Sequence, residues 1–183
     1  MTHDTITQFV CFITNLNFDD FIPAWEHFSK ELKSKKNNPA LLMQIAETKT
    51  KYRYISQHEW PEKDFHFSFM NEKKAEHFPD HNARVVQIGG YTLVENIKKQ
   101  PKEEHAIKLL AFIGHNETDI AFYSTLPGYH QLRIHQAYYE SCMYAFVLQY
   151  SVSETNAPEL LAQLKQRAGV ELGIYKEALV QHA

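Results

Sequence analysis

The 183-residue sequence contains no apolar run of 18 residues, so we expect no membrane-spanning helix. Its formal net charge is only -3, which provides no strong field to attract nucleic acid or anionic lipid. The first residues, MTHDTITQF, lack the basic and apolar regions of a secretory signal. We therefore expect a cytoplasmic protein that binds neither nucleic acid nor membranes.

Several motifs of catalysis and cofactor binding are also missing from the sequence. There is no GxGxxG or P-loop for nucleotides, no GxSxG for an activated serine, and no CxxC or HExxH for zinc. The two cysteines, Cys11 and Cys142, lie in apolar strand-like runs and are too few for a disulfide framework. We expect buried thiols in a reducing compartment, no metal and no cofactor.

Spacings of apolar residues predict four strands and two helices in the first half of the chain. Residues 6–14 are apolar on both alternating faces, which is typical of a central strand. Phe21 and Trp25 belong to an apolar stripe at helical spacing, and Gly89-Gly90 indicates a bulge. The predicted order is strand 6–14, helix 19–36, strand 40–47, strand 52–60, helix 61–78 and strand 84–95.

A polar linker at residues 96–104 separates this unit from a second one with the same order of elements. Its short helix ends at the Pro127-Gly128 turn, and its second helix has Pro158 at an early position. The predicted elements are strand 106–114, a short helix before residue 127, strands 131–140 and 142–152, helix 157–169 and strand 170–180.

The repeated β-α-β-β-α-β order is that of the ferredoxin-like split βαβ unit. One such sheet would leave an apolar face in water, whereas two sheets facing each other would bury it and create a barrel. We therefore predict an α+β fold with tandem ferredoxin-like repeats, at residues 1–97 and 104–183. Together they would form a dimeric-α+β-barrel-like pseudo-dimer, either within one chain or in a homodimer.

One stretch, from Lys49 to Phe78, carries a family resemblance. It reads as a strand ending in Trp60, the sequence PEKDF, and a helix leading to His77. This stretch, together with the order of elements, resembles the dimeric α+β barrel superfamily, especially its antibiotic-biosynthesis-monooxygenase-like group. The resemblance implies a small-molecule ligand, because the group includes cofactor-independent quinone-forming monooxygenases, haem-degrading monooxygenases and small-molecule-binding proteins.

The haem-degrading members of that group have an Asn at the end of the first strand, a Trp in the second helix and a His near that helix's end. Asn15 matches the first and His77 the third, while Phe69 falls at or near the position of the Trp. Asn15 could also serve as a turn and capping residue, and His77 as a solvent-facing residue at a helix end.

Aromatic and histidine side chains on two predicted strands are further candidates. Tyr54, His58 and Trp60 share one face of strand 52–60, and His135 and Tyr139 share one face of strand 131–140. If these faces line a barrel, they form a wall suited to a phenolic or quinone ligand; if they face helices, they are core. The candidate catalytic residues are Asn15, His58 and His77; the candidate ligand-binding residues are Tyr54, Trp60, Phe69, His135 and Tyr139.

Three hypotheses about function follow. The first is a small-molecule-binding protein that acts as a cofactor-independent monooxygenase on an aromatic or quinol-type substrate. His58 or His77 would then be the base, and Asn15 would hold the developing enolate. The second is a haem-binding or haem-degrading protein with His77 as the axial ligand. The third is a ligand-binding or stress-related module without a reaction.

Overall fold

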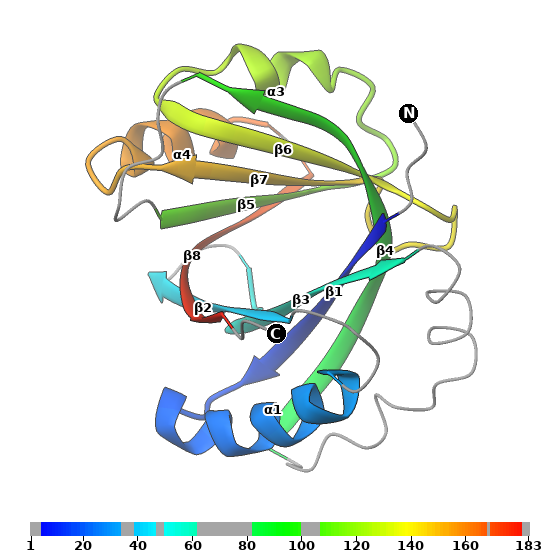
Figure 1. Cartoon of the computed structure of the whole chain (residues 1–183). Coiled ribbons are helices and arrows are strands. Elements are labelled where there is room, and N and C mark those ends of the chain that lie inside the picture. Colours follow the sequence, from blue (N-terminus) through cyan, green and yellow to red (C-terminus); the bar gives the residue numbers. More distant parts are fainter. Residues whose placement is uncertain are drawn as a thin grey trace.

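The computed structural model describes residues 5–33, 39–46, 50–61, 82–99, 107–167 and 169–180. These residues form eight strands and three helices (Figure 1). The strands are β1 (Thr5–Thr14), β2 (Ala40–Ala46), β3 (Tyr54–Pro61), β4 (Ala83–Lys98), β5 (Ile107–Ile113), β6 (Tyr129–Ala137), β7 (Phe146–Val152) and β8 (Val170–Val180). The helices are α1 (Phe18–Lys33), α3 (Ala121–Thr125) and α4 (Ala157–Lys165).

All eight strands belong to one closed antiparallel barrel with the strand order β1-β3-β2-β8-β5-β7-β6-β4. Two strands connect its two sides. β4 pairs with β1 along its first part and with β6 along its second part. β8 pairs with both β2 and β5. Figure 1 shows β4 (green) and β8 (red) running between the lower strands and the upper ones.

The predicted fold class, an α+β pseudo-dimer of tandem ferredoxin-like repeats, is therefore wrong. The described chain is mostly sheet, and its helices include the five-residue α3. The physical reason is the length of β4, whose 16 residues extend to Lys98 and enter the predicted linker. Glu95 and Asn96 are exposed, but their backbones pair with β6, so their polarity does not end the strand. Each strand edge finds a partner, and one barrel closes instead of two separate sheets.

Most individual elements are confirmed close to their predicted bounds. The last strand spans Val170–Val180, as predicted. The bulge predicted at Gly89-Gly90 is confirmed by a register shift opposite Phe9 and Val10. The helix predicted at residues 61–78 lies outside the described residues, apart from Pro61, which ends β3. The division into residues 1–97 and 104–183 stays a prediction.

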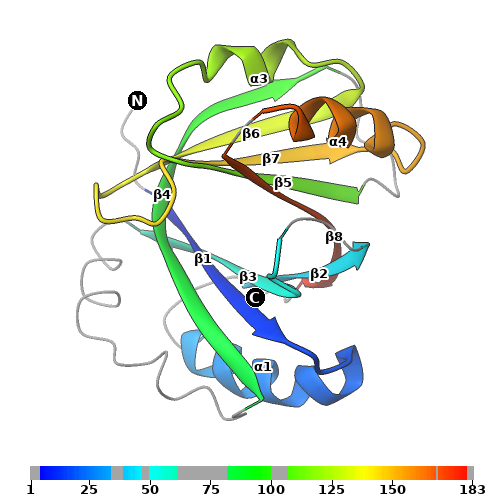
Figure 2. The same ribbon diagram turned by 180° about the vertical axis from the view of Figure 1, so that it is seen from behind.

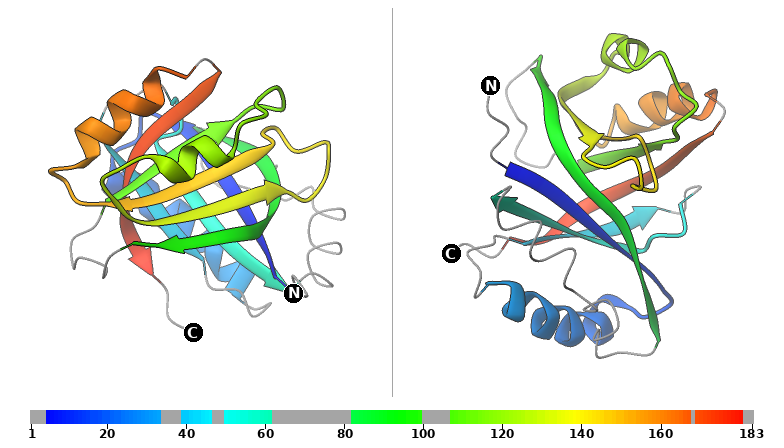
Figure 3. Two further views of the ribbon diagram at one scale, coloured as in Figure 1. Left: turned by 90° about the horizontal axis from the view of Figure 1, so that it is seen from above. Right: turned by 90° about the vertical axis from the view of Figure 1, so that its right-hand side faces the viewer.

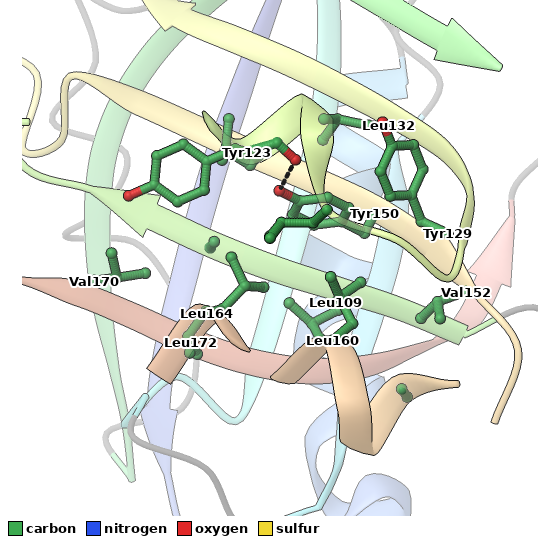
Figure 4. Packing of buried hydrophobic residues seen from close by; sticks show 14 of the residues in the cluster. Leu109, Tyr123, Tyr129, Leu132, Tyr150, Val152, Leu160, Leu164, Val170 and Leu172 are labelled. Carbon is green, nitrogen blue, oxygen red and sulfur yellow. Dashed lines mark hydrogen bonds between the residues drawn. The ribbon is translucent and has the colours of Figure 1, made fainter. Parts of the chain in front are cut away.

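Helices cover two outer faces of the barrel. The amphipathic α1 packs on β1 and β3, where the rings of Phe21 and Tyr54 stack with centroids 4.0 Å apart. On the opposite side, α3 and α4 cover β5, β6 and β7 (Figures 2 and 3). There the Tyr150 hydroxyl donates to the Tyr123 carbonyl oxygen at 3.0 Å, among packed leucines and valines (Figure 4). In the described part of the chain, no helix is long and apolar enough to cross a membrane.

A third apolar cluster fills much of the barrel interior and combines residues from both halves of the chain. Because side chains alternate along a strand, each strand sends every second residue inward. The buried members of this cluster are Phe9, Cys11, Leu42, Tyr52, Ile55, Ile88, Tyr91, Leu110, Phe112, Cys142, Val147 and Tyr175. The polar part of the interior lies at one end of the barrel, and it contains the candidate site.

Candidate functional site

Strand β3 separates two chemically different faces. Tyr54 packs in the α1 cluster, and Ser56 and His58 lie on the same face. Ile55 packs in the interior cluster, and Gln57 and Glu59 follow it on the inner face. The inner face therefore becomes polar towards the end of β3, and these polar residues border a cavity.

The cavity has a volume of about 220 Å³ and opens where β2 and β5 begin and β3 ends. We call it the mouth cavity. Six strands contribute to its wall, which consists of Ala40, Leu42, Gln57, Glu59, Lys108, Arg133, Gln149 and Glu177. Mouths of β-barrels are a common place for ligand sites. Two acidic, two basic and two amide side chains give this mouth its chemical character.

Charge of each sign occupies its own side of the mouth. Glu59 on β3 and Glu177 on β8 flank β2, whereas Lys108 on β5 and Arg133 on β6 flank β7. We call these the acidic wall and the basic wall. Arg133 Nη2 lies 3.5 Å from Glu59 Oε1, with the two side chains 26% and 49% exposed. Lys108 Nζ donates to Ser151 Oγ at 2.6 Å.

Two buried amides join the walls below these charges. Gln149 Nε2 donates to Gln57 Oε1 at 3.3 Å, although the two residues are 92 positions apart in the sequence. Both side chains are nearly buried. The Gln149 side chain also lies within hydrogen-bonding reach of the buried His135 ring on β6. Both amides are therefore held by neighbours within the barrel, and they present fixed polar groups to the cavity.

His135 lies inside the barrel, on the same strand as Arg133. Its side chain is fully buried, within hydrogen-bonding reach of the Gln149 side chain. The ring contacts Phe9 edge-on, with centroids 5.4 Å apart. Burial first, and then the nearby charge of Arg133, lower the pKa of His135 to about 3, while the Gln149 side chain acts in the opposite direction. The imidazole is therefore neutral at pH 7.

The sequence left open whether the face with Tyr54, His58 and Trp60 lines the barrel or faces a helix. The structure places this face against α1. His58 Nε2 and Ser56 Oγ are 2.7 Å apart, and the same hydroxyl accepts from Trp25 Nε1 at 2.9 Å. His58 is fully buried, and burial lowers its pKa to about 3. Tyr54 is buried as well and donates to the Leu16 carbonyl oxygen at 3.1 Å.

The remaining candidates are scattered. Trp60 is buried and donates from Nε1 to Gln8 Oε1 at 2.9 Å. Tyr139 lies beyond the end of β6, so it does not share a strand face with His135 as predicted. Asn15 is exposed in the loop between β1 and α1. The residue that caps α1 is Asn17, whose Oδ1 accepts a hydrogen bond from the Asp20 backbone N–H at 2.9 Å.

Phe69 and His77 lie outside the described residues. Among the candidate residues that the structure describes, only His135 lies near the mouth cavity. Sequence reasoning missed Gln57, Glu59, Lys108, Arg133, Gln149 and Glu177. A signal existed on β3, because Gln57 and Glu59 alternate with its aromatic face and have no apolar role of their own.

The opposite end of the interior is lined by hydrogen-bonded tyrosines. Tyr144 donates to Glu171 Oε2 at 2.6 Å, and its hydroxyl lies 3.0 Å from that of Tyr52. Burial, followed by these hydrogen bonds, raises the pKa of Tyr144. The described residues hold no group of three His, Cys, Asp or Glu side chains suited to a metal ion.

Comparisons with known proteins leave the family open. The chain matches no family model and no curated protein sequence. One solved structure to which it is similar is a mutant chlorite dismutase from Candidatus Nitrospira defluvii. The two share 9% sequence identity, with 94% of this chain and 92% of the other covered and a TM-score of 0.49. A likeness of this size establishes neither a shared family nor a shared activity.

Proposed function

We propose that the protein binds a small polar molecule in the mouth cavity. The observation that carries this proposal is the cavity at the mouth of the barrel, which six strands wall with two acidic, two basic and two amide side chains. The side chains of Gln57 and Gln149 are buried and bonded to each other, so their positions are fixed. Fixed polar groups around a concave site orient a small polar ligand.

The size of the cavity restricts the ligand. Cavities for drug-sized molecules usually have 300–1,000 Å³, and the mouth cavity has about 220 Å³. A molecule with few non-hydrogen atoms fits this space better than a multi-ring aromatic compound. The polar lining supports the same choice, because most of the wall consists of charged and amide side chains.

The resemblance to antibiotic-biosynthesis-monooxygenase-like proteins supports a finer proposal, a cofactor-independent monooxygenase. Tyr54 and His58 lie against α1, so this chemistry would use the mouth cavity or residues 62–81. In the mouth cavity it predicts oxygen uptake with a single-ring quinol and no added cofactor, because a three-ring anthrone exceeds a volume of about 220 Å³. If a broad panel of such substrates gives no uptake, the protein binds its ligand without this reaction.

The haem-binding alternative rests on His77, outside the described residues. The mouth cavity does not fit a haem, because its wall contains no histidine and its volume is only about 220 Å³. Hemin titration tests this alternative directly. A shift of the visible absorption band in wild type that is absent in His77→Ala would support it.

Native mass spectrometry of freshly purified protein tests the main proposal. We expect a retained small ligand in wild type, and loss of that ligand in Gln149→Leu. Gln131→Leu is the matched control, because Gln131 also lies on a barrel strand but donates to Asn96 at an exposed position. Retention in Gln149→Leu equal to that in wild type would place the ligand elsewhere.

Thermal-shift screening of a panel of small polar metabolites extends the test to ligands that dissociate during purification. If the native mass spectrum of wild type shows no bound ligand and no compound in the panel raises its melting temperature, the proposal is wrong.

A further inference from the structure

We propose that the ligand of the mouth cavity is a small zwitterion of the amino-acid class, which binds with its ammonium group at the acidic wall and its carboxylate at the basic wall. This inference rests on the proposed function and specifies its ligand. It depends on how the charges are arranged around the barrel.

The two walls adjoin where β8 pairs with β5, and they face each other across the mouth between β3 and β6, where Glu59 contacts Arg133. In the strand order β3-β2-β8-β5-β7-β6, the acidic residues Glu59 and Glu177 lie on the first and third strands. The basic residues Lys108 and Arg133 lie on the fourth and sixth. An anion would meet two carboxylates, and a cation would meet an ammonium and a guanidinium. A molecule with both charges meets an opposite charge on each side.

Arg133 suits the carboxylate of such a ligand. Its planar guanidinium has five N–H donors and binds carboxylates best with two parallel hydrogen bonds. Arg133 forms an ion pair with Glu59 through a single long contact of 3.5 Å, and both side chains are partly exposed. Such pairs are weak in water, so a ligand carboxylate can bind the remaining donors or replace Glu59. Glu59 then becomes available to the ligand's ammonium group.

The amides provide a position for the ammonium group between the walls. Gln149 starts from β7 in the basic wall and reaches Gln57 on β3 in the acidic wall. The amide pair lies between the two walls and lines the cavity. An ammonium has three N–H donors, so it can bind both glutamates of the acidic wall and still donate to an amide oxygen. Ala40 and Leu42 leave room for a short apolar part of the ligand.

Binding of matched compounds to the wild-type chain provides the first test. The panel consists of the twenty α-amino acids, short ω-amino acids such as γ-aminobutyrate, and betaine, measured by isothermal titration calorimetry. For the tightest binder, its decarboxylated amine and its deaminated acid are then measured; for γ-aminobutyrate these are n-butylamine and butyrate. We expect each analogue with one charge to bind at least tenfold more weakly than the zwitterion.

Two variants assign each charge of the ligand to its wall. In Arg133→Gln, the zwitterion is expected to bind no better than its amine analogue, because the carboxylate has lost its partner. In the double variant Glu59→Gln/Glu177→Gln, the zwitterion is expected to bind no better than its acid analogue, because the ammonium group has lost both carboxylates of the acidic wall. Lys176→Gln is the control, because Lys176 is exposed and alternates with Glu177 along β8, and its binding should equal that of wild type.

Several results would overturn the zwitterion while leaving the proposed function in place. These are an acid or an amine analogue that binds as tightly as the zwitterion, a neutral compound retained in the native mass spectrum, or binding confined to uncharged members of the metabolite panel. If no compound binds and the native mass spectrum shows no bound ligand, both proposals are wrong. The tests on wild type remain decisive even if a variant fails to fold.

Discussion

Gln149 donates a hydrogen bond to Gln57 at 3.3 Å across the barrel interior, and this contact joins β7 to β3. Removing one partner leaves a buried amide unpaired, which costs about 1–3 kcal/mol. We expect Gln57→Leu to reduce the free energy of unfolding by that amount. Gln149→Leu should cost at least as much, because it also removes the contact of Gln149 with the buried His135 ring.

A double-mutant cycle measures this contact. Urea unfolding of wild type, both single variants and the double variant should give a coupling energy of about 0.5–1.5 kcal/mol. Additive effects of the two substitutions would mean that the amides are not bonded to each other in solution.

The position of these glutamines also explains what the sequence could not provide. A period of two residues divides β3 into two faces, but it does not say which face is inside. The aromatic face, with Tyr54 and Trp60, was a reasonable wall for a ligand. It packs instead on α1, where Trp25 donates to Ser56, because bulky rings fill the layer between a helix and a sheet.

Local patterns predicted the strands and helices well because they depend on neighbouring residues. The bounds of β8 and the bulge near Gly89 needed no knowledge of the rest of the chain. The closure of the barrel did need it, since it depends on β4 pairing with β1 and β6 at once. The mouth cavity was missed for the same reason: Gln57 and Gln149 meet only when the barrel closes.

Two buried histidines should make the protein sensitive to acid. Burial lowers the pKa of both His58 and His135 from 6.5 to about 3. Between pH 6.5 and pH 3, both histidines bind a proton in the unfolded chain but not in the folded chain. The free energy of unfolding therefore falls as the pH is lowered from about 6.5 towards 3, by about 1.4 kcal/mol per pH unit for each histidine.

Substitution separates this effect from that of the carboxylates. In His135→Leu, the loss of stability between pH 5.5 and 4 should be smaller than in wild type by about 1.4 kcal/mol per pH unit, measured by urea unfolding. Val94→Ala is the control, because Val94 is 38% exposed and has no titrating group, and its pH profile should run parallel to that of wild type. A His135→Leu profile parallel to wild type would show that His135 is protonated in the folded chain.

Tyr144 should stabilise the tyrosine-lined end of the barrel through its hydroxyl group. This group donates to Glu171 at 2.6 Å and lies 3.0 Å from the Tyr52 hydroxyl. Hydrogen bonds to charged groups contribute more than neutral ones. We expect Tyr144→Phe to lower the free energy of unfolding by about 1.5–3 kcal/mol.

The matched control for this change is Tyr129→Phe. Tyr129 donates to the neutral Ser124 carbonyl oxygen at 2.7 Å, so its loss should cost only about 0.5–1.5 kcal/mol. Equal losses in the two variants, measured by urea unfolding at pH 7, would mean that the charge of Glu171 adds nothing.

Gly89 is expected to tolerate no side chain, for two physical reasons that can be separated. Its φ is +127°, which L-residues rarely adopt, and an added Cβ would lie 2.5 Å from Cys142 Sγ. Backbone strain and overpacking each cost about 1–3 kcal/mol. Gly89→Ala should therefore lower the free energy of unfolding by about 2–6 kcal/mol. At Gly114 a Cβ would meet nothing within 4 Å, so Gly114→Ala should change stability by less than about 0.5 kcal/mol.

The double variant Gly89→Ala/Cys142→Ala removes the sulfur but keeps the backbone conformation. Because the Cys142 Cβ would still lie 2.9 Å from the new methyl group, we expect only part of the steric cost to be recovered. In urea unfolding, the double variant should therefore be about 1 kcal/mol more stable than the sum of the two single-variant effects predicts. Strict additivity would contradict the contact between these residues, and with it the close approach of Cys142 to β4 at the bulge.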